Sequence, residues 1–195
     1  MGAGVSNWRL ARAVSQLGQL GVVSGTALDV ILARRLQEGD PGGDMRRALA
    51  RFPIPGMAQR ALDRYFVPGG KPADQPFKPT PVLSQQPAPA LVELVVLANF
   101  AEVFLAKEGH TGLVGINYLQ KIQLPTLPSL FGAMLAGVDY VLMGAGIPMA
   151  IPGLLDQLAR ADATRLNLEV EGAAAGEEFF ALSISPPFAE RRRPS

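Results

Sequence analysis

The chain has 195 residues, of which 48% are hydrophobic, and its formal net charge is +1. This length and apolar content suffice for one domain with a packed core and exclude a disordered chain. The small net charge gives no long-range field for nucleic acid or acidic lipid, so we expect neither as a partner. The absence of cysteine excludes disulfides and thiolate metal sites and fits a reducing compartment. We therefore expect a cytoplasmic protein without a secretory signal.

The first half of the chain predicts helices around one short strand. Ser6 is the expected N-cap of a helix that ends at Gly18. QLGVVSG (19–25) is apolar, β-branched and bounded by glycines, which is typical of a buried strand. An amphipathic helix is then expected at 26–39, and two short helices are expected at 44–52 and 56–66. The Pro-rich stretch 67–89 predicts an extended loop.

The second half predicts strands that alternate with helices. The apolar run 90–107 contains Asn99 and two glutamates, so it predicts a buried helix and not a membrane span. A strand, a helix, a strand and a helix are then expected at 113–119, 127–137, 138–146 and 151–161. The segments 164–172 and 178–185 alternate apolar and polar residues, as a strand pair does. The alternation predicts parallel βαβ units, in a doubly wound sheet or a (β/α)8 barrel.

The tetrapeptide Met-Gly-Ala-Gly occurs twice, at 1–4 and at 143–146. The second copy closes a predicted strand, and ligands of parallel α/β folds lie outside the carboxyl ends of the strands. Glycines there let backbone N–H groups approach a flat ring or a phosphate. The dinucleotide pattern GxGxxG is not met, because Asn7 and Met149 occupy its third glycine position. Close packing of turns is the alternative explanation.

Three landmarks resemble the nitronate monooxygenase family, formerly called 2-nitropropane dioxygenases. MGAGVSNWRLARAVSQLGQLGVVSGTAL (1–28) resembles the family's first βα unit, VGINYL (114–119) its Gly-Val-Asn-Leu strand, and YVLMGAGIP (140–148) its Phe-Gly-Leu-Pro strand. The long insert at about 40–110 is similar to that of a larger subgroup. That subgroup is related to the enoyl-reductase-type flavoproteins of polyunsaturated fatty-acid synthesis.

The resemblance implies a fold, a partial (β/α)8 TIM barrel that binds FMN. Residues 1–195 would form a single incomplete domain, with a helical and Pro-rich insert at about 40–110 and a β-hairpin at about 164–185. The family has a strand before its first glycine turn, a catalytic His in a Gly-Gly-His motif, and late Gly-rich loops for the FMN phosphate. None of these is matched here, so we expect the N-terminal portion of such an enzyme or a diverged short product.

The resemblance also implies which residues contact the flavin. Asn117 would hydrogen-bond the ring, since its amide offers both donors and an acceptor; a strand-end cap is the alternative. Lys121 would lie near the ring, although a solvated surface position is the better expectation. The full set of expected cofactor-binding residues is Gly2, Ala3, Gly4, Asn117, Gln120, Lys121 and Gly144.

The only histidine, His110, stands in the polar turn KEGHTG and not in the family's catalytic motif. We expect an exposed loop residue there, so the catalytic residue is unknown. No metal site is expected.

The function implied by the resemblance is FMN-dependent oxidation of alkyl nitronates with O2, in a truncated form that need not be active. An enoyl-thioester reductase with the same barrel and cofactor is one alternative. A non-catalytic remnant or interaction module is another, because open sheet edges favour self-association. A small molecule, a nitronate or an enoyl thioester, is the expected substrate.

Overall fold

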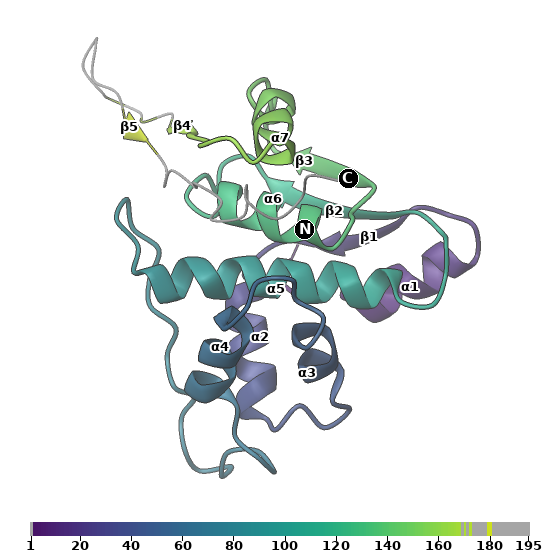
Figure 1. Ribbon diagram of the computed structural model, residues 1–195, viewed down its shortest axis with the longest axis vertical. Coiled ribbons are helices and arrows are strands. Elements are labelled where there is room, and N and C mark those ends of the chain that lie inside the picture. The colour runs from purple at the N-terminus through teal and green to yellow at the C-terminus, as the bar shows by residue number, and fades with distance from the viewer. Residues whose placement is uncertain (1, 169, 171, 173–178, 181–195) are drawn as a thin grey trace.

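A computed structural model describes residues 2–168, 170, 172, 179 and 180 of the chain (Figure 1). They form an α/β fold whose helices are α1 (Trp8–Gln16), α2 (Leu28–Gln37), α3 (Asp44–Leu49), α4 (Met57–Tyr65), α5 (Pro89–Lys107), α6 (Thr126–Leu135) and α7 (Ile151–Ala159). The strands are β1 (Gly21–Ser24), β2 (Val114–Leu119), β3 (Tyr140–Gly144), β4 (Asn167–Leu168) and β5 (Phe179–Phe180).

The predicted parallel βα units are confirmed. The strands β1, β2 and β3 form a three-stranded sheet in chain order, and both pairs are parallel. In its register Gly21 lies opposite Val114, and Gly115 lies opposite Tyr140. The sheet does not close into a barrel within the described residues.

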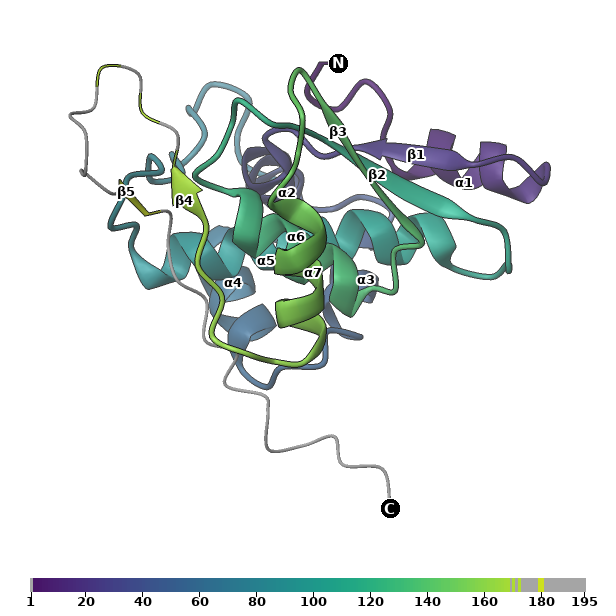
Figure 2. The same ribbon diagram turned by 90° about the horizontal axis from the view of Figure 1, so that it is seen from above.

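The helices gather on one side of this sheet (Figure 2). The central helix is α5, which packs against α1, α2, α3, α4 and α6 and against the sheet. Side chains alternate between the two faces of a strand, so Tyr140 and Leu142 point away from the helices. Tyr140 is 52% exposed, and Leu142 and Val22 are half-buried. Parallel sheets are usually covered on both faces, and none of the described helices covers the second face here.

Helix α5 is a core helix. It is long and apolar enough to cross a membrane, yet 72% of its most apolar window is buried inside the protein. Its polar residues have partners in the core: Asn99 donates from Nδ2 to the Val95 carbonyl and to Ser129 Oγ. Glu102 accepts hydrogen bonds from Trp8 and Arg35. These partners explain how the predicted buried helix carries polar side chains.

The start of α1 differs from the prediction. Asn7, not Ser6, is the N-cap, because Asn7 Oδ1 accepts hydrogen bonds from the N–H groups of Arg9 and Leu10 at 3.0 and 3.3 Å. The Ser6 hydroxyl donates instead to the Val22 carbonyl at 2.6 Å. Ser6 therefore connects the chain before α1 to the edge of β1.

The predicted strand pair is confirmed only in its centre. The strands β4 and β5 pair antiparallel, with Asn167 opposite Phe180 and Leu168 opposite Phe179. The rest of the hairpin expected at about 164–185 includes positions 169, 171, 173–178 and 181–185, which lie outside the described residues.

Hydrogen bonds of Asp139 connect the start of β3 to β2 and to α5. Its Oδ2 accepts hydrogen bonds from Lys107 Nζ and from the Val114 N–H, the latter at 2.7 Å. Burial pushes the pKa of Asp139 up, but the hydrogen bonds from Lys107 and Val114 and the charge of Lys107 outweigh it, so the pKa lies below its usual value. A carboxyl with a lowered pKa stabilises the fold above its unfolded pKa and loses this effect as pH falls through the folded pKa.

We expect Asp139→Asn to lower the free energy of unfolding by about 1–2 kcal/mol at neutral pH, because charged hydrogen bonds are lost. The loss should shrink in acid, where the wild-type carboxyl is protonated too. Urea unfolding of both proteins at neutral and acidic pH measures this difference. Asp162→Asn, in an exposed pair with Arg160, is the control and should change little. A difference between Asp139→Asn and wild type that does not depend on pH would contradict this account.

Candidate functional site

Asn117 and Gly144 come together at the carboxyl end of the sheet, where ligands of parallel α/β folds bind. Asn117 is paired with Ser24 of β1 and Leu142 of β3, so it lies in the middle of the sheet. Its neighbour Tyr118 points to the helices, so the Asn117 side chain belongs to the open face. A Cβ built on Gly144 would stand 3.8 Å from Asn117 Oδ1.

The amide of Asn117 carries an unused acceptor. Its Oδ1 is buried and has no hydrogen-bond partner among the described residues. An unpaired buried oxygen of this kind costs about 1–3 kcal/mol, and buried acceptors are normally satisfied. Because this oxygen has no partner in the described part of the protein, turning it toward a ligand would break none of its hydrogen bonds. Asn117 is therefore poised to accept a hydrogen bond from a ring lying on the open face.

Gln120 stands next to Asn117 and Gly144. Its N–H donates to the Gly144 carbonyl at 2.9 Å. Its side chain packs on the glycine turn, because a Cβ on Gly146 would meet Gln120 Oε1 at 2.0 Å. Lys121, one residue further, is exposed. The structure thus gathers three of the expected flavin residues, Asn117, Gln120 and Gly144, and puts Lys121 on the surface beside them.

The first glycine turn lies on the other side of β1. The Ser6 carbonyl accepts from the Ser24 N–H at 2.8 Å, so residues 2–7 run along the edge of β1 away from β2. Gly4 has a left-handed φ of 68° and faces Ile31 of α2, while Gly2 and Ala3 are exposed. In both views this segment begins near the carboxyl ends of the strands (Figures 1 and 2). These contacts place Ser6 at the edge of β1, and no described hydrogen bond joins Gly2, Ala3 or Gly4 to Asn117.

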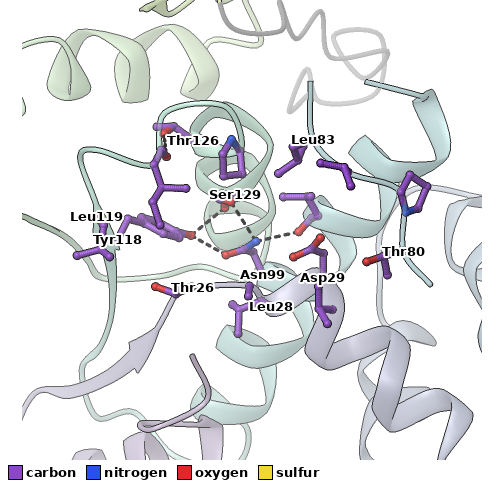
Figure 3. Close-up of a pocket in the computed structure, with 18 residues that line it drawn as sticks. Thr26, Leu28, Asp29, Thr80, Leu83, Asn99, Tyr118, Leu119, Thr126 and Ser129 are labelled. Atoms are coloured by element: carbon purple, nitrogen blue, oxygen red, sulfur yellow. Dashed lines mark hydrogen bonds between the residues drawn. The ribbon is translucent and has the colours of Figure 1, made fainter. Parts of the chain in front are cut away.

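A separate pocket opens on the helical side of the same sheet end (Figure 3). Its volume is about 350 Å³. Tyr118 forms its floor: the hydroxyl contacts Asn99 Oδ1 at 2.8 Å and donates to the Ser129 carbonyl at 3.0 Å. Burial raises the pKa of the Tyr118 phenol well above its ordinary value, so the ring remains neutral.

Asp29 is the one ionisable carboxyl in the lining of this pocket. It stands in the first turn of α2, after a turn in which Ala27 adopts a left-handed φ of 55°. Burial raises the pKa of Asp29, and the hydrogen bonds from the Val30 and Asp29 N–H groups offset this only in part. Asp29 is not among the residues expected from the sequence, although an acidic residue just after a strand-end turn is a recognisable signal. Residues 80–83 form one wall of the pocket. No pattern in the sequence indicates that they lie next to the sheet.

No family model, curated protein or solved structure matches this chain.

The expectation of an exposed His110 is wrong. The ring is half-buried and folds back on the end of α5: Nε2 contacts the Ala106 carbonyl at 2.6 Å, and Nδ1 accepts from the Gly112 N–H at 3.1 Å. His110 precedes β2 and so lies at the amino end of the strand, opposite Asn117. Its role is to hold the turn between α5 and β2.

Metal-binding side chains do not gather in the described part of the chain. Among residues 2–168, 170, 172, 179 and 180, no group of three or more His, Asp or Glu side chains could hold an ion.

Proposed function

We propose that this chain is part of an FMN-dependent oxidoreductase of the nitronate monooxygenase type, with its three parallel strands as one sector of a (β/α)8 barrel. The flavin ring would lie on the open face of the sheet, over Asn117 and Gly144. The observation that carries the proposal is the buried, unpaired Oδ1 of Asn117 beside a glycine at the carboxyl end of a parallel sheet.

The residues present fit an isoalloxazine ring. Asn117 supplies an acceptor for a ring N–H, and Gly144 has no side chain to keep a flat ring away. The half-buried Leu142 and Val22 give the same face an apolar surface. When bound, FMN would take electrons from the nitronate and pass them to O2. The chain's part in this reaction is to hold the ring and orient its polar edge.

The residues around Asn117 favour a flavin as the cofactor, but they do not distinguish between the two candidate substrates. Asn117 and Gly144 would serve an enoyl-thioester reductase equally well, and the nitronate is favoured by the resemblance of residues 1–28 and 140–148 alone. His110 cannot act as a base here, because it lies at the opposite end of β2.

We expect Asn117→Ala to weaken FMN binding about tenfold, since one hydrogen bond of roughly 1.4 kcal/mol is lost. Gly144→Val should weaken binding further, because its side chain would occupy the ring's position. Titration of FMN, followed by quenching of flavin fluorescence, measures both effects. Asn167→Ala, an exposed asparagine in β4, is the matched control. If all four proteins bind FMN with equal affinity, the proposed ring site is wrong.

The open face also favours a second candidate, a non-catalytic module that pairs with a second copy of itself. The strand β3 is the last of its sheet in the described chain, and Tyr140 on it is 52% exposed. A free strand edge next to exposed apolar side chains favours association. Sedimentation at several concentrations tests this reading. A dimer that Leu142→Lys abolishes, in a chain that takes up no FMN, would favour the module over the enzyme.

A further inference from the structure

The pocket on the helical face of the sheet is a cavity with its own lining. It is enclosed by the turn after β1, the start of α2, the helices α5 and α6, and residues 80–83 of the Pro-rich segment. Its walls are apolar, with Leu28, Leu83 and Ile122 among them. A volume of about 350 Å³ is at the small end of the range for ligand pockets. The site therefore suits a small molecule with an apolar body.

The polar side chains on the floor of the pocket already have hydrogen-bond partners within the protein. Tyr118 contacts Asn99 and Ser129, and Asn99 Nδ2 donates to Ser129 Oγ at 3.2 Å and to the Val95 carbonyl at 2.8 Å. This network joins β2, α5 and α6, and each of these side chains has a polar partner within it. A ligand would gain little by replacing these bonds.

Asp29 is different, because its carboxyl is the charged group of the pocket and lacks a cation. Figure 3 shows it rising from the start of α2 into the space between Asn99 and Thr80. Its hydrogen bonds come from two backbone N–H groups of its own helix turn, and it forms no ion pair with any described Lys, Arg or His. Burial nevertheless takes water from it and raises its pKa. A cationic group on a ligand would supply the missing counter-charge.

We propose that this pocket binds a small primary amine with an apolar body, its ammonium group on Asp29 and its body against Leu83 and Ile122. The site is independent of the flavin proposal, since Tyr118 and Asn117 are neighbours that point to opposite faces of the sheet. The pocket and the open face can be occupied at the same time.

The test compares two probes of the same shape, 2-phenylethylamine and 2-phenylethanol, by calorimetric or NMR titration at neutral pH. We expect the amine to bind wild type about tenfold more tightly than the alcohol, because only the amine pairs with the carboxylate. In Asp29→Asn this preference should disappear. Asp74→Asn, an exposed acid in the Pro-rich loop, removes the same charge elsewhere and should keep the preference.

A second variant locates the site. Leu83→Trp fills the pocket from a segment outside helices and strands, so we expect it to fold and to lose binding of both probes. Equal binding of amine and alcohol to wild type would overturn the proposal. So would an amine preference that survives in Asp29→Asn, or amine binding that a folded Leu83→Trp variant retains.

Discussion

Replacing Glu102 by alanine is expected to lower the free energy of unfolding by about 3–5 kcal/mol, because it leaves a partly buried charge without its partner. The Glu102 carboxylate is 4% exposed and pairs with Arg35, which is 23% exposed. Its other oxygen accepts a hydrogen bond from the backbone N–H of Trp8 at 2.9 Å. This N–H lies in the first turn of α1 and does not donate to the side chain of Asn7, the N-cap. One side chain of α5 thus holds both α1 and α2, and with them the glycine segment ahead of α1.

The same helix offers a matched control for this prediction. Glu93 also pairs with an arginine, Arg60, but that arginine is 58% exposed, so Glu93→Ala should cost less than about 1 kcal/mol. Urea unfolding of the two variants under one set of conditions measures the difference. The double variant with Glu102→Leu and Arg35→Met should recover part of the loss, because it removes both charges. If Glu102→Ala and Glu93→Ala lower the free energy of unfolding equally, the pair of Glu102 and Arg35 does not stabilise the fold more than an exposed pair does, which would contradict this account.

Gly132→Ala is expected to destabilise the protein by about 3 kcal/mol through overpacking, despite the better helix propensity of alanine. Gly132 lies where α6 packs against α5, and its Cβ would stand 2.2 Å from the Val96 carbonyl oxygen. A backbone atom cannot turn aside as a side chain can, so α6 must move away. That movement would also stretch the 3.2 Å hydrogen bond from Asn99 to Ser129 under the pocket.

Gly153→Ala in α7 is the control for this substitution. Nothing lies within 4 Å of a Cβ at Gly153, so the change should raise the stability by about 0.5–1 kcal/mol through helix propensity alone. Thermal unfolding of the two variants should therefore shift in opposite directions. A Gly132→Ala protein as stable as wild type would mean that α5 and α6 are not packed as closely as described.

Local sequence patterns predicted most of the fold because their causes are local. The glycine-bounded apolar run of β1 and the apolar length of α5 need no distant partner to be recognised. The resemblance implied that Asn117 and Gly144 share one flavin site, and the parallel register of β2 and β3 brings them together at one sheet edge. The N-cap was misassigned because Ser6 is engaged by Val22, a contact that helix patterns do not contain.

The features that sequence reasoning missed depend on distant residues. Glu102 finds Arg35 and Trp8 across 67 and 94 positions of the chain. The pocket around Asp29 needs residues 80–83, which have no periodicity to place them. The position of Ser6 at the edge of β1 depends on Val22 and Ser24, which lie 16 and 18 positions away in the chain.

The most direct test of the central claim uses flavin rings that carry no phosphate. Lumiflavin and 3-methyllumiflavin differ only in the ring N–H that Asn117 would accept. Titration of the whole chain with each, followed by flavin fluorescence, should show saturable binding of lumiflavin and about tenfold weaker binding of the methylated ring. In Asn117→Ala the two rings should bind alike. Equal affinity of the wild-type chain for both rings, or binding of neither, would contradict the assignment of this sheet end as a flavin site.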